Sequence, residues 1–182
     1  MNAIIFVSKT LIDLYILSYV LRLVLQWVRA DFYNPFSQFI MRITNPLVLP
    51  GRKLLPAVGR IDTATAVAIL LLEILAVVFL YWLITGALPS RPGEVLLYAA
   101  LRTIVAFINL YFFAIIIRVI QSWIAPGTHN PVTAVIWSIT EPLMAPVRRL
   151  IPDIGGLDLS PLFVIIGLQA LRMLIPLPPG LL

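Results

Sequence analysis

The chain has 182 residues, of which 61% are hydrophobic and only 12% are charged, and its mean hydropathy is +1.03. A soluble domain is roughly half apolar and about a quarter charged, and a chain this short has too little interior to hide so much apolar surface. Composition therefore excludes a soluble globular protein and a disordered one. The lack of cysteine excludes disulfides, thiolate metal sites and cysteine nucleophiles.

Four apolar stretches are long enough to consider as transmembrane helices, which need about 20 residues. They cover residues 4–28, 64–83, 95–124 and 159–175. The first stretch continues to Trp27 without a small-residue cleavage site, so we interpret it as a retained span and not as a signal peptide. The third is over-long, and the fourth is only marginally long enough before Pro176 stops it. The predicted fold class is an all-α membrane protein with four transmembrane helices.

An amphipathic segment follows the first and the third span. It covers residues 35–47 in one case and 131–143 in the other. An apolar stripe of about three turns cannot cross a bilayer, so we expect a helix in the interface plane or a re-entrant segment. Each segment starts with a good N-cap residue before a proline at the first helical position, Asn34-Pro35 or Asn130-Pro131.

Prolines punctuate the rest of both segments. We expect Pro46 and Pro142 to end or kink the amphipathic helix. The prolines that follow should force an extended or turned path. They are Pro50, Pro56, Pro146 and Pro152.

The chain contains an internal repeat with an offset of 96 residues. Residues 12–75 align with 108–171 without a gap, and about twenty of the sixty-four pairs are identical. Each unit holds two spans, so the two units start on the same side of the membrane and are parallel repeats. The predicted organisation is a first repeat over 1–86, a linker over 87–93, a second repeat over 94–176 and a tail over 177–182.

The distribution of Lys and Arg predicts the orientation. Seven of these residues lie in the loops inside the repeats and four lie on the opposite side, so the positive-inside rule places the loops in the cytoplasm and both termini outside. The seven are Arg29, Arg42, Arg52, Lys53, Arg60, Arg148 and Arg149. The four are Lys9, Arg91, Arg102 and Arg172.

A basic pair stands in each loop, Arg52-Lys53 and Arg148-Arg149. Three interpretations stay open for these pairs: topology anchors at anionic headgroups, a docking site for a cytoplasmic partner, or an ion vestibule. Four basic residues without interleaved aromatic residues do not form a nucleic-acid site.

Polar and aromatic residues also mark the ends of the spans. Asp62 and Asp158 precede the second span of each repeat, and we expect both to cap the following helix. Trp27 and Trp123 lie near the ends of the first spans and are predicted to anchor them at the interface.

Ionisable residues inside the spans are candidates for function. Arg22 and Arg118 occupy the same place in both repeats, where they can snorkel to the interface or pair with an acid in a neighbouring span. Glu73 lies deep in the second span and its counterpart is Gln169, so polarity recurs but charge does not. That difference favours interhelical hydrogen bonding, with an Arg–Glu pair as the alternative.

Three motifs stand out, namely Arg22-x3-Gln26-Trp27, the run from Asp31 to Phe36, and a Pro-x3-Pro-x-Arg-x3-Pro spacing in each half. With these motifs the chain resembles the YggT/YlmG family over nearly its whole length. In the second copy Gly127-Thr128-His129 replaces Asp31-Phe32-Tyr33, so the aromatic entry to that loop is weaker. The resemblance implies a small inner-membrane protein with two such modules and without known catalytic residues. Bacterial members are associated with osmotic-shock tolerance and potassium uptake, and relatives in cyanobacteria and chloroplasts with nucleoid distribution, division and assembly of a haem-bearing cytochrome complex.

Two function classes remain after these observations. The residues form no metal-ligand cluster, nucleophile–base pair or glycine-rich phosphate loop, so we expect no enzyme and no cofactor, and only His129 could ligate haem. We expect a protein that contributes to osmotic-stress tolerance and potassium homeostasis. The alternative is a membrane scaffold or assembly factor that recruits a cytoplasmic partner through its Pro/Arg loops. The expected partners are anionic lipid headgroups and a second copy or another protein, but no nucleic acid.

Overall fold

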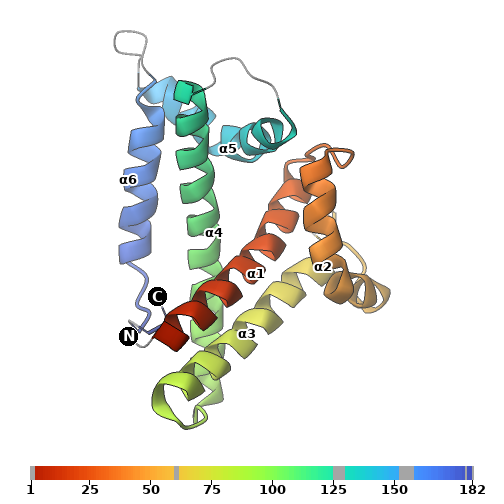
Figure 1. Ribbon diagram of the computed structural model, residues 1–182, viewed down its shortest axis with the longest axis vertical. Coiled ribbons are helices and arrows are strands. Elements are labelled where there is room, and N and C mark those ends of the chain that lie inside the picture. Colours follow the sequence, from red (N-terminus) through yellow and green to blue (C-terminus); the bar gives the residue numbers. More distant parts are fainter. Residues whose placement is uncertain (1–2, 60–61, 125–129, 152–157, 179, 182) are drawn as a thin grey trace.

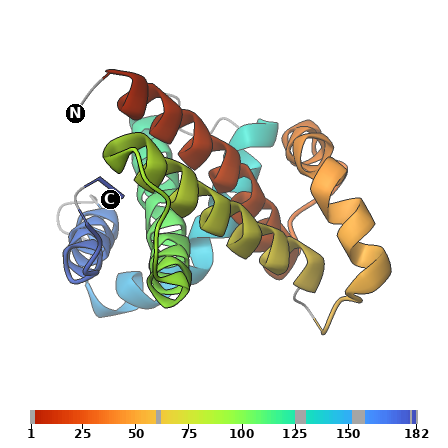
Figure 2. The ribbon, with the colours of Figure 1, turned by 90° about the horizontal axis from the view of Figure 1, so that it is seen from below.

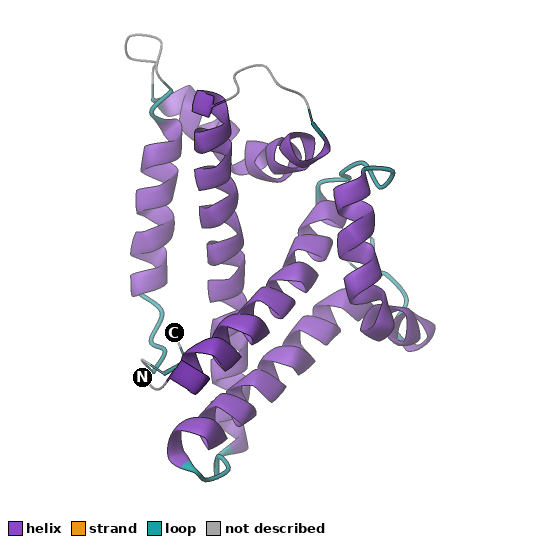
Figure 3. Ribbon diagram, viewed as in Figure 1, coloured by secondary structure: helices purple, strands orange, loops and turns teal. Residues whose placement is uncertain are grey.

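The computed structural model describes residues 3–59, 62–124, 130–151, 158–178, 180 and 181. Six α-helices make up the regular structure of these residues, and they confirm the all-α class (Figure 3). In chain order they are α1 (Ala3–Trp27), α2 (Pro35–Leu54), α3 (Thr63–Thr85), α4 (Pro92–Ile124), α5 (Pro131–Leu150) and α6 (Ser160–Met173).

Among the described residues, three helices are long and apolar enough to cross a membrane, namely α1, α3 and α4. The fourth expected span, 159–175, is an apolar helix of only 14 residues, α6. A proline in its first turn marks its start, and the chain leaves the helix at Leu174, just before Pro176. At 1.5 Å per residue, α6 is about 21 Å long, whereas the 33 residues of α4 extend over about 50 Å.

The amphipathic helices are longer than the sequence predicts. Instead of ending near residues 47 and 143, α2 and α5 continue through two internal prolines each to Leu54 and Leu150. The expected extended path at Pro50 and Pro146 is therefore wrong. The two prolines of each helix are four residues apart and lie on one face, so the lost hydrogen bonds bend the helix without breaking it. The bend of α2 is visible in Figures 1 and 2.

The helices form two crossed layers (Figures 1 and 2). In the first half α1 packs against α3, and in the second half α4 packs against α6. Because α4 also contacts α1, α3 and α5, it joins the two halves. Both α2 and α5 lie at the end of the molecule away from the two chain termini, which share the opposite end (Figure 1).

The predicted N-caps begin α2 and α5. The Asn34 Oδ1 atom accepts a hydrogen bond of 2.9 Å from the Phe36 amide, and Asn130 Oδ1 accepts one of 2.8 Å from the Thr133 amide. Asn34 also uses its amide group, because Nδ2 donates to the Pro131 carbonyl at 2.6 Å. This bond connects the start of α2 in one half with the start of α5 in the other.

Candidate functional site

A buried arginine connects each first span to its amphipathic helix. In the first half, Arg22 Nη1 of α1 donates to Thr44 Oγ1 at 2.7 Å and to Asn45 Oδ1 at 2.9 Å, both on α2. Arg22 is only 6% exposed. Thr44 in turn donates to the Ile40 carbonyl, which orients its oxygen toward the guanidinium. We call this contact the first arginine latch.

The second half has the same contact at the same repeat positions. Arg118 Nη1 of α4 donates to Thr140 Oγ1 at 2.8 Å, and Arg118 Nη2 contacts Glu141 Oε2 at 2.7 Å, both on α5. The guanidinium carbon also lies 3.7 Å from the centre of the Trp137 ring. This second arginine latch therefore contains an ion pair and a cation–π contact, whereas the first contains neutral partners.

Neither arginine reaches water by snorkelling, and among the described residues neither pairs with an acid of another span. Both are 6% exposed and bind the amphipathic helix that follows their own span. An arginine suits this position because its planar guanidinium donates to two acceptors at once and stays charged when buried. Each latch fixes the middle of its amphipathic helix against the span that precedes it, a position that the apolar stripe alone does not determine.

An Arg–Asp ion pair closes each unit. Arg52 at the end of α2 binds Asp62, which precedes α3, with an Nε–Oδ2 distance of 3.1 Å. In the second half Arg148 binds Asp158 at the same spacing of ten residues, with an Nε–Oδ2 distance of 3.0 Å. The end of each amphipathic helix is thus joined to the start of the helix that follows it. Arg148 Nη1 additionally contacts Glu141 at 3.0 Å, so the two contacts of the second half form one network.

These pairs correct the expected capping role of Asp62 and add a second role to Asp158. The Asp62 side chain makes no capping bond to α3 and instead accepts from Arg52 and from Thr65 Oγ1. Asp158 accepts from the Ser160 amide at 2.8 Å as well as from Arg148, so it combines both roles. The difference arises because α2 and α5 remain helical through their prolines and bring the arginines within reach.

The paired carboxylates predict a loss of stability in acid. Burial tends to raise the pKa of Asp62, but the hydrogen bonds from Arg52 and Thr65 outweigh it, and the pKa lies below its ordinary value. Burial also tends to raise the pKa of Asp158, but the hydrogen bonds from Ser160 and Arg148 outweigh it, so this pKa too lies below its ordinary value. Because the folded pKa is depressed, the stabilisation is present above the unfolded pKa of about 3.9 and is lost as the pH falls through the folded value.

We therefore expect the unfolding temperature of the purified protein to drop when the pH falls from 5 to 3. In the Asp62→Asn and Asp158→Asn double variant this drop should be smaller, since two titrating pairs are gone. Asp31→Asn is a matched control, because Asp31 is exposed and accepts only from the Tyr33 amide. A double variant with the same pH profile as the wild type would contradict this prediction.

A third group of charges, centred on the buried Arg102 and Glu73, has no counterpart in the repeat. Arg102 of α4 binds Glu73 of α3 through Nε at 2.7 Å and Asp13 of α1 through Nη2 at 2.6 Å. Its remaining nitrogen, Nη1, donates to the Leu181 carbonyl at 2.6 Å. Lys9 completes the group by contacting Asp13 at 2.7 Å. We call these side chains the Arg102 cluster.

The partner of Glu73 is therefore Arg102 and not Arg22. The distribution of Lys and Arg along the sequence places Arg102 only on the side opposite the repeat loops. Its position is not marked by the repeat, since Phe6 occupies the equivalent place in the first half. The sequence signal that could have identified Arg102 is its depth in the apolar stretch. It stands ten residues after Pro92, the first residue of α4. Gln169, the repeat counterpart of Glu73, is half-buried and has no hydrogen-bonded partner among the described residues.

The tail is part of the core. Leu177 and Leu181 are 7% and 4% exposed and pack against Val77, Leu80 and Val95. With the Leu181 carbonyl on Arg102, this segment covers one side of the Arg102 cluster. Beside the cluster lies a cavity of about 290 Å³ between α1, α4 and α6.

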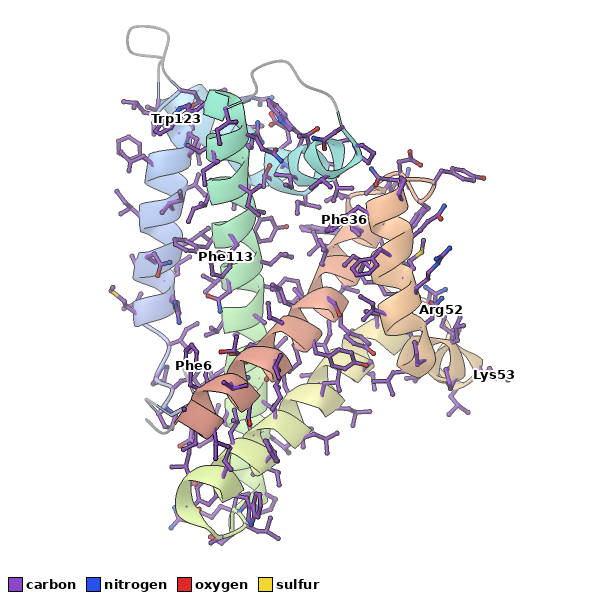
Figure 4. The ribbon with its side chains drawn as sticks, viewed as in Figure 1. Phe6, Phe36, Arg52, Lys53, Phe113 and Trp123 are labelled. Carbon is purple, nitrogen blue, oxygen red and sulfur yellow. The ribbon has the colours of Figure 1, made fainter. Side chains whose placement is uncertain are left out.

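The other predicted site residues stand at the surface or outside the described part. Lys53 and Arg149, next to the paired arginines, are exposed, and Lys53 lies at the outer edge of the molecule (Figure 4). Trp27 and Trp123 lie at the ends of α1 and α4 and are exposed. His129 and Pro152 lie outside the described residues, and Pro56 follows the end of α2.

Comparison with known proteins explains the doubled arrangement. A sequence model of the CCB3/YggT family matches residues 1–83 and 97–178. The chain belongs to the CCB3/YggT family. A YggT protein of Escherichia coli K12, described as uncharacterized, is 34% identical over 174 residues, which are 95% of this chain and 89% of the relative. No solved structure matches.

Two further relatives of this CCB3/YggT protein come from Gram-negative bacteria. An uncharacterized Pseudomonas aeruginosa protein is 42% identical over 174 residues, covering 96% of this chain and 88% of its own length. An uncharacterized Vibrio alginolyticus protein is 45% identical over 169 residues, covering 93% of this chain and 91% of its own. The family match falls once on the α1–α3 half and once on the α4–α6 half, and each match contains a complete arginine latch and its Arg–Asp pair.

Proposed function

We propose that this CCB3/YggT protein crosses the inner membrane of a Gram-negative bacterium four times, as two parallel repeats. The lengths of α1, α3 and α4 support three spans, and the common end shared by α2 and α5 supports the parallel arrangement. The excess of Lys and Arg at that end supports an orientation with α2 and α5 at the cytoplasmic surface and the termini in the periplasm. In this orientation the bilayer covers the exposed apolar side chains of the spans, such as Phe6, Leu11 and Phe113.

Within that membrane, the protein contributes without catalysis to osmotic-stress tolerance and potassium homeostasis. The observation that carries this proposal is that α2 and α5 are each fastened twice to their spans, by an arginine latch and by an Arg–Asp pair. Exposed apolar residues on α2, such as Phe39 and Leu49, fit a helix seated in the headgroup region.

Because α2 and α5 are each attached at two points, a change in bilayer thickness that moves the spans also moves these two helices. Spans adjust their tilt when the thickness of the hydrocarbon layer changes, at a modest cost per ångström of mismatch. Because osmotic swelling stretches and thins the membrane, α1 and α4 tilt, and the latches carry the movement to α2 and α5. The paired state of Glu73 supports a sensor more than an ion conduit, since its carboxylate is occupied by Arg102.

Complementation tests this proposal. A strain that lacks the gene should regain growth after osmotic downshift and in low-potassium medium when it carries the wild-type protein. The Arg22→Gln and Arg118→Gln double variant should lose most of this rescue at normal protein abundance, because both latches are weakened. Arg91→Gln should rescue fully, since Arg91 is exposed and pairs only with Glu94.

A milder pair of changes guards against misfolding. Thr44→Val and Thr140→Val remove one acceptor from each latch while both arginines remain. Partial rescue by this variant, between the wild type and the arginine variant, is the expected order. Full rescue by both latch variants at equal abundance would contradict the proposed coupling.

A second candidate function is a scaffold that holds a cytoplasmic partner, and the exposure of Lys53 and Arg149 favours it. These residues follow the paired arginines at equivalent repeat positions and make no side-chain bond to the described residues. In the same complementation assay, a scaffold predicts that Lys53→Glu with Arg149→Glu abolishes rescue while the latch variants rescue normally. The coupling proposal predicts the reverse, so one set of strains separates the two.

A further inference from the structure

The cavity beside the Arg102 cluster lies between the two halves of the protein. It has a volume of about 290 Å³, and its walls come from α1, α3, α4, α6 and the tail. Among the described residues α1 and α6 do not contact each other, so this side of the cavity is not closed by helix packing. Figure 2 shows α1 and α6 apart from each other.

The charges around the cavity leave a basic excess. Lys9, Arg102 and Arg172 contribute three positive charges, and Asp13 and Glu73 contribute two negative ones, so the sum is +1. Both carboxylates are already engaged, since Asp13 binds Lys9 and Arg102 while Glu73 binds Arg102. Arg172 is half-buried and has no hydrogen bond or ion pair with any described side chain. A ligand that completes this site is therefore an anion.

One end of the cavity lies near the membrane surface on the side of the chain termini. Arg172 stands in the last turn of α6, a helix of about 21 Å that is shorter than the roughly 30 Å hydrocarbon layer. The chain continues past α6 into the tail, and Leu181 of the tail lines the cavity together with Arg172. Lys9 approaches the same space from α1.

An apolar wall continues from the charges toward the middle of the membrane. Leu14 and Leu17 supply it from α1, and Phe113 supplies it from α4. Phe113 is eleven residues beyond Arg102, which corresponds to about 16 Å along the helix. Figure 4 shows Phe113 part-way along α4, and Phe6 near the start of α1. The lining is polar at one end and apolar at the other, as an amphiphile requires.

We propose that this cavity binds the phosphate headgroup of an anionic phospholipid from the leaflet on the side of the termini. Lys9 and Arg172 contact the phosphate, and one acyl chain lies along Leu14, Leu17 and Phe113. Arg102 keeps its two carboxylates and holds the wall of the site in place. The inference is independent of the osmotic function, since it rests on a group of residues outside both arginine latches.

The test uses the purified full-length protein in nanodiscs of phosphatidylcholine with increasing phosphatidylglycerol, with bound lipid counted by native mass spectrometry. One phosphatidylglycerol molecule should be retained by the wild type. Arg172→Gln should weaken this retention about fivefold, the effect of one basic residue near an anionic lipid. Arg91→Gln is the matched control, because it removes an exposed positive charge from the same side of the protein.

Two further arms make the result decisive. Asn109→Phe introduces bulk into the cavity wall without changing its charge, and it should also reduce retention. Inorganic phosphate at millimolar concentration should raise the unfolding temperature in detergent less than a phosphatidylglycerol with short acyl chains does. Equal retention by wild type and Arg172→Gln would overturn the site, and equal stabilisation by inorganic phosphate would overturn the lipid as its ligand.

Discussion

Replacing Glu73 with alanine is expected to lower the free energy of unfolding by about 3–5 kcal/mol, the cost of removing one partner from a buried ion pair. Glu73 and Arg102 have side chains that are 2% and 5% exposed, and Nε and Oε2 are 2.7 Å apart. The loss arises because Arg102 keeps its charge inside the protein with only the partly exposed Asp13 to balance it. Unfolding in mixed micelles with increasing dodecyl sulfate measures the difference.

Two comparison variants identify the cause of this loss. Glu94→Ala removes a carboxylate from an exposed pair on α4 and should change the free energy by less than about 1 kcal/mol. The double variant Glu73→Leu with Arg102→Met removes both charges and should regain most of the stability, since a buried pair often exchanges for apolar residues at little cost. If Glu73→Ala is no worse than Glu94→Ala, the Arg102 cluster does not stabilise the fold.

Loss of Arg118 is expected to release α5 more completely than loss of Arg22 releases α2. Arg118 contributes a charged partner at 2.7 Å and the Trp137 ring, whereas Arg22 binds two neutral oxygen atoms. Since charge-assisted bonds are about twice as strong as neutral ones, and a cation–π contact adds about 0.5–2 kcal/mol, Arg118→Ala should cost about 1–2 kcal/mol more than Arg22→Ala. The two positions are a matched pair, because the repeat places them identically.

Distances between spin labels report this release directly. The chain has no cysteine, so labels attach only where cysteine is introduced. Labels at Ser122 and Ser138 report on α4 and α5, and labels at the equivalent Gln26 and Arg42 report on α1 and α2. Each distance distribution should broaden in the variant of its own half and stay narrow in the variant of the other half. Broadening in both halves with either variant would show a general loss of structure and not the release of one helix.

The repeat explains how much of these contacts can be predicted from the sequence. Arg22 and Thr44 both recur after 96 residues, as do Arg52 and Asp62, so the sequence marks the partners as positions that matter in both halves. Their pairing could not be predicted, because it depends on α2 remaining helical through Pro46 and Pro50. Proline removes one backbone donor, and sequence rules do not tell whether the helix stops there or bends.

The Arg102 cluster could not be predicted from the repeat either, for a different reason. Repeat matching finds residues that occur twice, and Arg102, Glu73 and Lys9 face Phe6, Gln169 and Val105 in the other half. A contact that joins α1, α3 and α4 with the tail requires the crossing of the two halves, which no spacing within one helix encodes. The short α6 was similarly visible in the sequence as a marginal apolar stretch, but the cavity beside it was not.

The bond from Asn34 to the Pro131 carbonyl joins the two halves of the chain where their amphipathic helices begin. One side chain caps its own helix and reaches the equivalent helix of the other half. In a chain with a single module, the same interaction would need a second molecule. The covalent link between the halves thus replaces a dimerisation equilibrium with an intramolecular encounter, which no longer depends on how many copies the membrane holds.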